Sequence, residues 1–200
     1  MGKDPEVKAS LATATMAFIA STLGEPALKN VLAGLDSQDL SSVRGLLPSD
    51  RIPERTYHDL LVGAGRCLAA TPGSRKPKDY FFEMGKYLAN DGVNKYYKSL
   101  IRMFDTKFML TKSPHIWGLI HSHGSLTVET LSNTSCYVYI SDYPVPCKEF
   151  CYMMAGYMSA VAEMTKAHVI RIDEIECVNQ GAKRCKYFGE WKPVSPQQKA

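Results

Sequence analysis

The segment from Cys147 to Trp191 constrains the fold of this chain more than any other part of the sequence. It contains four of the six cysteines, at positions 147, 151, 177 and 185. Cys177 and Cys185 flank a short Asn-Gln-Gly turn, so the two arms of a β-hairpin could bring both thiols to one point. Cys151 lies in a preceding stretch of helical periodicity. The segment therefore predicts a helix fastened to a two-stranded ribbon.

A bound metal ion would explain this grouping. Structural zinc sites use four ligands drawn from thiolates, imidazoles and sometimes carboxylates. Glu174 lies three residues before Cys177, an odd offset that places two side chains on opposite faces of a regular strand. A β-bulge near Glu174 would therefore be needed for both to reach one ion. Cys151 would come from the helix, and Cys147, one helical turn earlier, is a rival ligand.

Two other interpretations of these cysteines stay open from the residues alone. Buried thiols often act as small apolar side chains. Cys177 and Cys185 could also form a disulfide, although disulfides are rare in the cytosol. The sequence contains no Cys-x-x-Cys knuckle, which is the usual spacing signal for zinc.

The bulk composition excludes several classes of function. The chain has 200 residues and a net charge of +4, with Lys and Arg spread along its length rather than gathered in a basic patch. No apolar run is long enough to cross a bilayer, and the N-terminus lacks the apolar region of a signal peptide. We therefore expect a cytoplasmic protein with no direct nucleic-acid contact and no membrane span.

Hydrophobic periodicity predicts an α+β fold with an antiparallel sheet and helices largely on one face. The expected order is N-terminal helices, a β-meander, a helix and a C-terminal β-hairpin that carries the zinc site. Helices are expected over residues 8–23, 26–34, 37–47, 53–70, 78–89, 91–104 and 147–165. Strands are expected near residues 116–121, 125–131, 135–141, 168–177 and 183–191.

The run from Glu174 to Trp191, Glu-Ile-Glu-Cys-Val-Asn-Gln-Gly-Ala-Lys-Arg-Cys-Lys-Tyr-Phe-Gly-Glu-Trp, resembles the C-terminal signature of 4-vinyl-reductase-type domains. That family is related to haem nitric-oxide-binding domains and to Golgi-transport subunits. It includes the sensor domain of phenol- and xylene-responsive activators. The resemblance implies a structural zinc ion bound by four residues, which are Cys151, Glu174, Cys177 and Cys185.

The resemblance also suggests a division of the chain. Residues 51–192 would form the ligand-binding domain of the 4-vinyl-reductase type, and residues 193–200 a disordered tail. Residues 1–50 would form an N-terminal helical extension. Small side chains cover one face of the helix expected over residues 8–23, so this extension is suited to dimerisation, and we predict a homodimer.

The family fold implies a pocket for a small apolar molecule between the helices and the sheet. Aromatic walls with a few polar anchors are typical of such pockets. Trp117 and His115 offer N–H donors as the polar anchor, although each aromatic residue could instead be ordinary core. His121 and His123 could chelate a metal or lie at a solvated strand end. The predicted pocket residues are Tyr97, Phe104, Phe108, His115, Trp117 and Tyr157.

These features predict a small-molecule sensor or carrier with a pocket for an aromatic or hydrophobic ligand and a structural zinc ion. One alternative is an enzyme acting on a tetrapyrrole or aromatic substrate. The sequence, however, shows no recognisable pairing of a nucleophile with a general base. Another is an assembly subunit. A further alternative is a haem-based gas sensor. Related haem domains carry the motif Tyr-x-Ser-x-Arg. In this chain Tyr97 and Ser99 have the required spacing, but Arg102 is separated from Ser99 by two residues instead of one.

Overall fold

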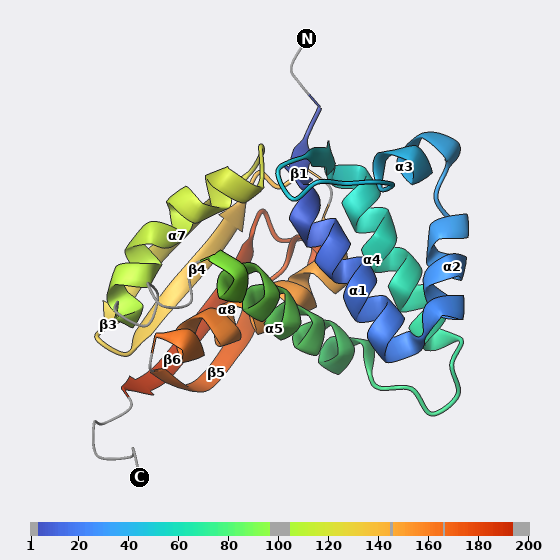
Figure 1. Cartoon of the computed structure of the whole chain (residues 1–200). Helices are drawn as coiled ribbons and strands as arrows, with labels where there is room; N and C mark the ends of the chain where they lie inside the picture. The colour runs from blue at the N-terminus through green and yellow to red at the C-terminus, as the bar shows by residue number, and fades with distance from the viewer. Residues whose placement is uncertain (1–3, 97–104, 145, 166, 194–200) are drawn as a thin grey trace.

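The computed structural model describes residues 4–96, 105–144, 146–165 and 167–193. The chain has a mixed α+β fold, as the sequence predicted. Helices from the N-terminal part gather on one side, and a four-stranded sheet lies on the other (Figure 1). Helices α5 and α8 lie between these two parts. Among the described residues, no helix combines the length and apolar character that crossing a membrane requires.

The N-terminal part contains four helices and a short two-stranded sheet. Gly24, with φ of 87°, separates the first two helices, a conformation that glycine adopts without steric cost. Their bounds are close to prediction, except that the third helix ends at Ser42 rather than near residue 47. The elements are β1 (Glu6–Lys8), α1 (Ala9–Leu23), α2 (Glu25–Ala33), α3 (Ser37–Ser42), β2 (Arg51–Pro53) and α4 (Glu54–Ala69).

The short sheet ties the start of the chain to helix α4. Strand β1 pairs antiparallel with β2, with Val7 opposite Ile52. Val7 also forms an isolated β-bridge with His121, which lies just after α7 (Thr106–Ile120). The residues that precede α1 therefore contact both parts of the molecule. The predicted boundary near residue 50 stays a prediction.

Helix α5 (Pro77–Tyr96) is continuous, so the division into two helices, ending at residue 89 and beginning at residue 91, is wrong. A glycine inside a helix costs only about 1 kcal/mol relative to alanine. Most helix stability in proteins comes from tertiary packing, and α5 packs along α8 (Lys148–Met164). The packing of α5 along α8 therefore outweighs the local preference of Asn90-Asp91-Gly92 for a turn.

Helix α7 was not expected, and the strand predicted near residues 116–121 is wrong. Asp105 caps this helix, because its Oδ1 accepts a hydrogen bond from the backbone N–H of Phe108 at 2.7 Å. Met109 and Trp117, two buried residues of the helix, lie eight positions apart, a helical spacing. A short apolar run such as Ile116–Ile120 cannot be assigned to helix or strand by periodicity alone.

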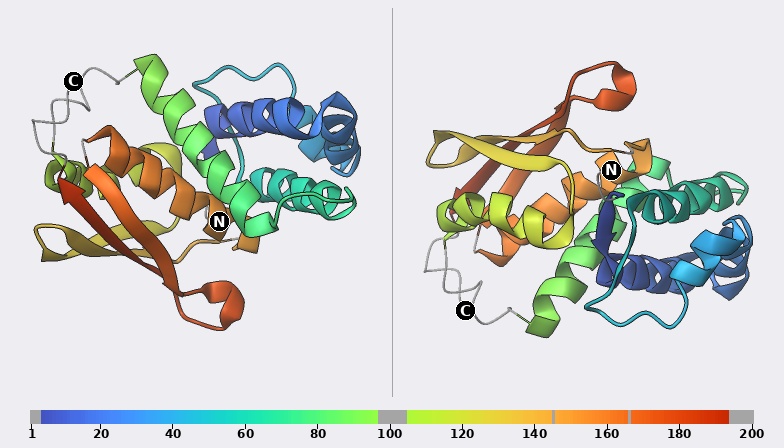
Figure 2. Two further views of the ribbon diagram at one scale, coloured as in Figure 1. Left: turned by 90° about the horizontal axis from the view of Figure 1, so that it is seen from below. Right: turned by 90° about the horizontal axis from the view of Figure 1, so that it is seen from above.

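The main sheet has the order β3-β4-β6-β5, and all its neighbouring strands are antiparallel. Cys136, Val138 and Ile140 alternate along β4 and face the core. Helices α7 and α8 lie on the same side of the sheet (Figure 2). All four strands match predicted ones. Their bounds are β3 (Ser125–Ser132), β4 (Ser135–Ser141), β5 (Ala167–Glu176) and β6 (Cys185–Pro193).

Candidate functional site

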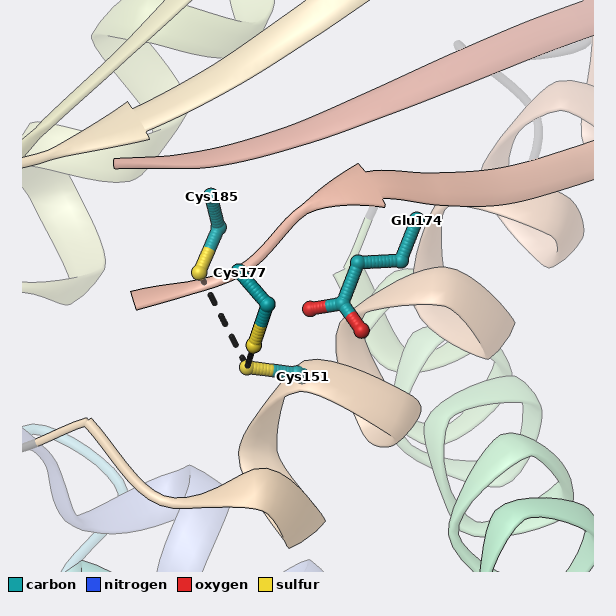
Figure 3. Close-up of side chains that lie close together, drawn as sticks. All are labelled: Cys151, Glu174, Cys177 and Cys185. Carbon is teal, nitrogen blue, oxygen red and sulfur yellow. Dashed lines mark hydrogen bonds between the residues drawn. The ribbon is translucent and has the colours of Figure 1, made fainter. Parts of the chain in front are cut away.

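The four predicted metal ligands lie together between α8 and the β5–β6 hairpin. One ligand atom from each of Cys151, Glu174, Cys177 and Cys185 lies within 4.8 Å of all the others. The Cys151 sulfur is 3.7 Å from that of Cys177 and 3.8 Å from that of Cys185. The three sulfurs and the carboxylate point toward one another (Figure 3). We call these four residues the thiol cluster.

Local backbone irregularities bring these residues to one point. The register of β5 against β6 shifts between Glu174 and Glu176, which is the bulge that the odd spacing of Glu174 and Cys177 required. A 3₁₀ turn, η1 (Val178–Gln180), follows, and Gly181 adopts a left-handed conformation with φ of 88°. The chain then returns to place Cys185 at the start of β6.

Polar side chains surround the thiol cluster. The Lys148 ammonium donates to Glu174 Oε2 at 2.6 Å and to the Cys177 sulfur at 3.4 Å. Asn179 donates to the Cys151 sulfur at 3.5 Å. A hydrogen bond from the Cys151 thiol lowers the pKa of Cys185 to about 7, which favours a thiolate near neutral pH. Three thiols and a carboxylate form a donor set that suits a thiophilic metal ion.

A second group of polar side chains is buried at the junction of the two parts of the molecule. Glu54 and His58 lie one turn apart on α4, and His121 follows α7. His121 Nδ1 lies 2.8 Å from Glu54 Oε1. The Tyr143 hydroxyl donates to the same carboxylate oxygen, and His58 Nε2 lies 2.8 Å from the Tyr143 hydroxyl. We call these four residues the relay.

Two relay atoms are buried without a hydrogen-bond partner among the described residues, Glu54 Oε2 and His58 Nδ1. Burial, together with the nearby His121, lowers the pKa of His58 to about 3, so His58 is neutral at physiological pH. Aromatic rings enclose the group. Trp117 stacks on His121 at 4.1 Å between ring centroids, and Phe150 stacks on Tyr143 at 4.5 Å.

The sequence prediction missed His58, Glu54 and Tyr143. A signal for the first two exists, because an acid and an imidazole four residues apart share one face of a helix. That face of α4 also carries Leu61 and is buried. Tyr143 gave no comparable signal, since it lies in a loop whose position depends on the whole fold.

Four of the six predicted pocket residues lie in the described part of the chain, three on α7 and one on α8, and the pocket stays a prediction. Trp117 is buried and donates its indole N–H to the backbone oxygen of His123 at 3.3 Å. His115 and Phe108 are exposed on α7, and Tyr157 is half-buried on α8. Tyr97 and Phe104 lie outside the described residues, as does the near-match to Tyr-x-Ser-x-Arg that begins at Tyr97.

A hollow of about 300 Å³ lies elsewhere, between α2, α3 and α4. Asp39, Arg55, Asp59 and Arg66 are among its lining residues. It contains none of the predicted pocket residues.

No family model matches the chain, and no curated protein matches it either. Solved structures of H-NOX proteins do match. A triple mutant of an H-NOX protein from S. oneidensis in the Fe(II) ligation state has a TM-score of 0.72 at 14% identity, over 94% of this chain and 98% of that chain. An Fe(II) unliganded H-NOX protein from K. algicida has a TM-score of 0.67 at 13% identity, over 96% and 100%.

The fold is that of the H-NOX proteins. An oxygen-binding H-NOX domain related to soluble guanylate cyclases, described as an oxygen complex, also matches, with a TM-score of 0.61 at 14% identity over 96% of this chain and 100% of that chain.

These matches correct two predictions. The 4-vinyl-reductase-type domain inferred from the run between Glu174 and Trp191 is wrong, because the chain is similar along nearly its whole length to H-NOX proteins. A match over so short a run shows similarity in one hairpin, and it does not identify the fold of the whole chain. Zinc as the cofactor is also wrong. The matching H-NOX structures are described as Fe(II), Fe(II)–nitric oxide or oxygen-bound states, and one is described by its haem.

Proposed function

We propose that this chain is a haem-based gas-sensor domain. The observation that carries the proposal is the similarity to H-NOX structures over at least nine-tenths of both chains in each comparison. This fold favours the haem alternative over a sensor for an apolar ligand built around structural zinc. A bound haem would supply an iron atom with a coordination position open to a diatomic gas.

The relay does not provide the haem site. Histidine is a common axial ligand of haem iron. His58, however, is buried on α4, and its ring packs against Tyr57, Tyr143 and Phe150. Within the described part of the chain, no cavity is shown beside its Nδ1. The lining of the relay therefore does not fit a haem, and we assign no iron ligand there.

Haem binding tests this proposal directly. We expect the purified chain to bind added haem in a one-to-one complex with a Soret band that shifts when carbon monoxide or nitric oxide is added to the reduced protein. A wild-type chain that folds but develops no Soret band contradicts the proposal.

We also propose that the thiol cluster binds a thiophilic divalent metal ion in a structural role. The observation that favours this second site is the convergence of four ligand atoms within 4.8 Å. Four protein ligands would leave no open coordination position for substrate. The ion would join α8 to the β5–β6 hairpin, because Cys151 and Cys185 come from these two elements.

Cobalt(II) is a suitable probe because its thiolate complexes absorb visible light. We expect one Co(II) per chain, thiolate-to-metal charge-transfer bands and a rise in melting temperature. Cys177→Ser should lose the bands and the stabilisation, whereas Cys67→Ser, at a half-buried cysteine on α4 outside the cluster, should keep both. Equal Co(II) binding by wild type and Cys177→Ser contradicts this site.

A further inference from the structure

The hollow between α2, α3 and α4 is lined along one side by a single stripe of α4. The stripe contains Arg55, Asp59, Gly63 and Arg66, whose spacing places them on one face of the helix. Asp59 and Arg66 are two helical turns apart, so about 10 Å of helix rise separates their backbones. The hollow therefore presents a carboxylate toward one end and a guanidinium toward the other.

The acidic end is built around Asp39 of α3. Asp39 is buried and accepts from the Thr56 hydroxyl through Oδ1 and from the Arg55 guanidinium through Oδ2, the latter at 3.1 Å. The same guanidinium lies 3.3 Å from a carboxylate oxygen of Asp36. One cation thus offsets two carboxylates, and these contacts fix the acidic end in place.

Asp59 adds a third carboxylate to this end. Among the described residues it forms neither a hydrogen bond nor an ion pair. Burial raises the pKa of Asp59 above its ordinary value, and so do the nearby carboxylates of Asp39 and Asp36. The guanidinium groups of Arg55 and Arg66 act in the opposite direction without cancelling this effect. A cationic group beside Asp59 would pair its carboxylate and offset the excess negative charge.

The middle of the hollow is apolar, where α2 packs against α4. A β-carbon on Gly63 would lie 3.0 Å from the Val31 side chain, so the two helices approach closely there. One turn further along α4, the Cys67 thiol donates to the carbonyl of Ala27 at 3.8 Å. The two helices therefore run antiparallel, and Val31 separates the two ends of the hollow.

The other end offers hydrogen-bond donors. Arg66 is exposed in the last turn of α4 and forms no ion pair within the described part of the chain. Asn30 of α2 also lines the hollow, and the antiparallel alignment places it at the Arg66 end. A guanidinium and an amide are donors suited to a carboxylate.

We propose that the hollow binds a small dipolar molecule, a linear amino acid whose ammonium group pairs with Asp59 and whose carboxylate pairs with Arg66. Its apolar chain lies along Val31. The volume of about 300 Å³ is that of a small ligand site. The relay residues of α4 lie on a neighbouring face of the helix, so this site goes beyond gas sensing and does not depend on haem.

The test uses the full chain and 6-aminohexanoate as the probe, followed by ¹H–¹⁵N NMR. We expect saturable shifts of the amide signals of Val31, Asp59 and Gly63. Hexylamine and hexanoate each lack one charged end, so they should bind about tenfold more weakly or worse. Binding should also peak at one length in the series 4-aminobutanoate, 6-aminohexanoate and 8-aminooctanoate, because both ends must be paired at once.

Two variants remove the charged ends separately. Asp59→Asn and Arg66→Gln should each weaken binding of 6-aminohexanoate by about tenfold or more. Arg44→Gln, at an exposed position after α3 and outside the hollow, is the matched control and should bind as wild type does. Far-ultraviolet circular dichroism checks that each variant is folded. If a variant does not fold, the ligand series on the wild-type chain decides alone.

Three results would overturn the proposal. The first is that no member of the series shifts the amide signals of the hollow in a saturable manner. The second is equal binding of hexylamine and 6-aminohexanoate, which would show a site for cations only. The third is unchanged binding in a folded Arg66→Gln variant.

Discussion

Gly85 of α5 lies directly against the backbone of Met153 in α8. A β-carbon on Gly85 would overlap the Met153 carbonyl oxygen, and one on Gly156 would overlap that of Phe82. The two helices therefore cross backbone to backbone, at positions that only glycine can occupy. This crossing sets the distance between α5 and α8, the helix that carries Cys151.

Gly85→Ala should destabilise the protein by about 3 kcal/mol or more, because a side chain at a closely packed position forces the helices apart. Gly92→Ala lies on the same helix, and among the described residues no atom beyond its own helix backbone and chain neighbours lies within 4 Å of the new β-carbon. It should be neutral or stabilising by up to about 1 kcal/mol. Urea unfolding of both variants measures the difference. Similar losses at both positions would show that helix propensity, rather than the crossing, governs α5.

Asp105→Ala should cost about 1 kcal/mol, the usual effect of losing a helix N-cap. Asp105 Oδ1 accepts from the backbone N–H of Phe108, in the first turn of α7, where no helix carbonyl is in position to accept it. Asp105→Ser keeps an acceptor and should recover most of the loss. Thermal unfolding of the two variants checks the order, and a Ser variant as unstable as the Ala variant would rule out capping as the cause.

We expect the ionisation of Tyr80 to lower the free energy of unfolding at alkaline pH. Burial raises the pKa of Tyr80 above its ordinary value of 10, and this outweighs the opposite effect of the hydrogen bond with Thr22. The unfolded chain then loses this proton at a lower pH than the folded chain, so stability falls as pH rises above about 10. Below that pH the contribution of Tyr80 does not change.

The measurement is urea unfolding between pH 8 and 11. Tyr80→Phe should have a flatter alkaline limb than wild type, and Tyr137→Phe, at a half-buried position in β4, should keep the wild-type slope. An unchanged slope in Tyr80→Phe would mean that the alkaline loss comes from other groups.

Lys148→Met should weaken Co(II) binding at the thiol cluster by roughly 10- to 100-fold, the range found when a hydrogen-bond partner of a metal ligand is removed. Lys148 donates to Glu174 Oε2 and the Cys177 sulfur, so it holds both ligands and offsets their negative charge. Lys107→Met, at an exposed position of α7, is the matched control. A Co(II) titration of both variants checks this, and tighter binding by Lys148→Met would mean that the lysine competes with the metal.

Sequence reasoning located the thiol cluster because its geometry is local. A hairpin brings Cys177 and Cys185 together whatever surrounds it, and the odd spacing of Glu174 required the bulge that the strand contains. The same reasoning could not find the Tyr143 hydroxyl beside Glu54, since these residues are 89 positions apart. Their contact depends on how α4, α7 and the loop before α8 pack.

The order of most helices and strands follows from hydrophobic spacing in the amino-acid sequence, because burial of one face requires that spacing in any fold. The continuous α5, the helical state of α7 and the contact between His58 and Tyr143 were decided by tertiary structure. In each case contacts between segments far apart in the chain outweigh the local preference, and no pattern within one segment records them.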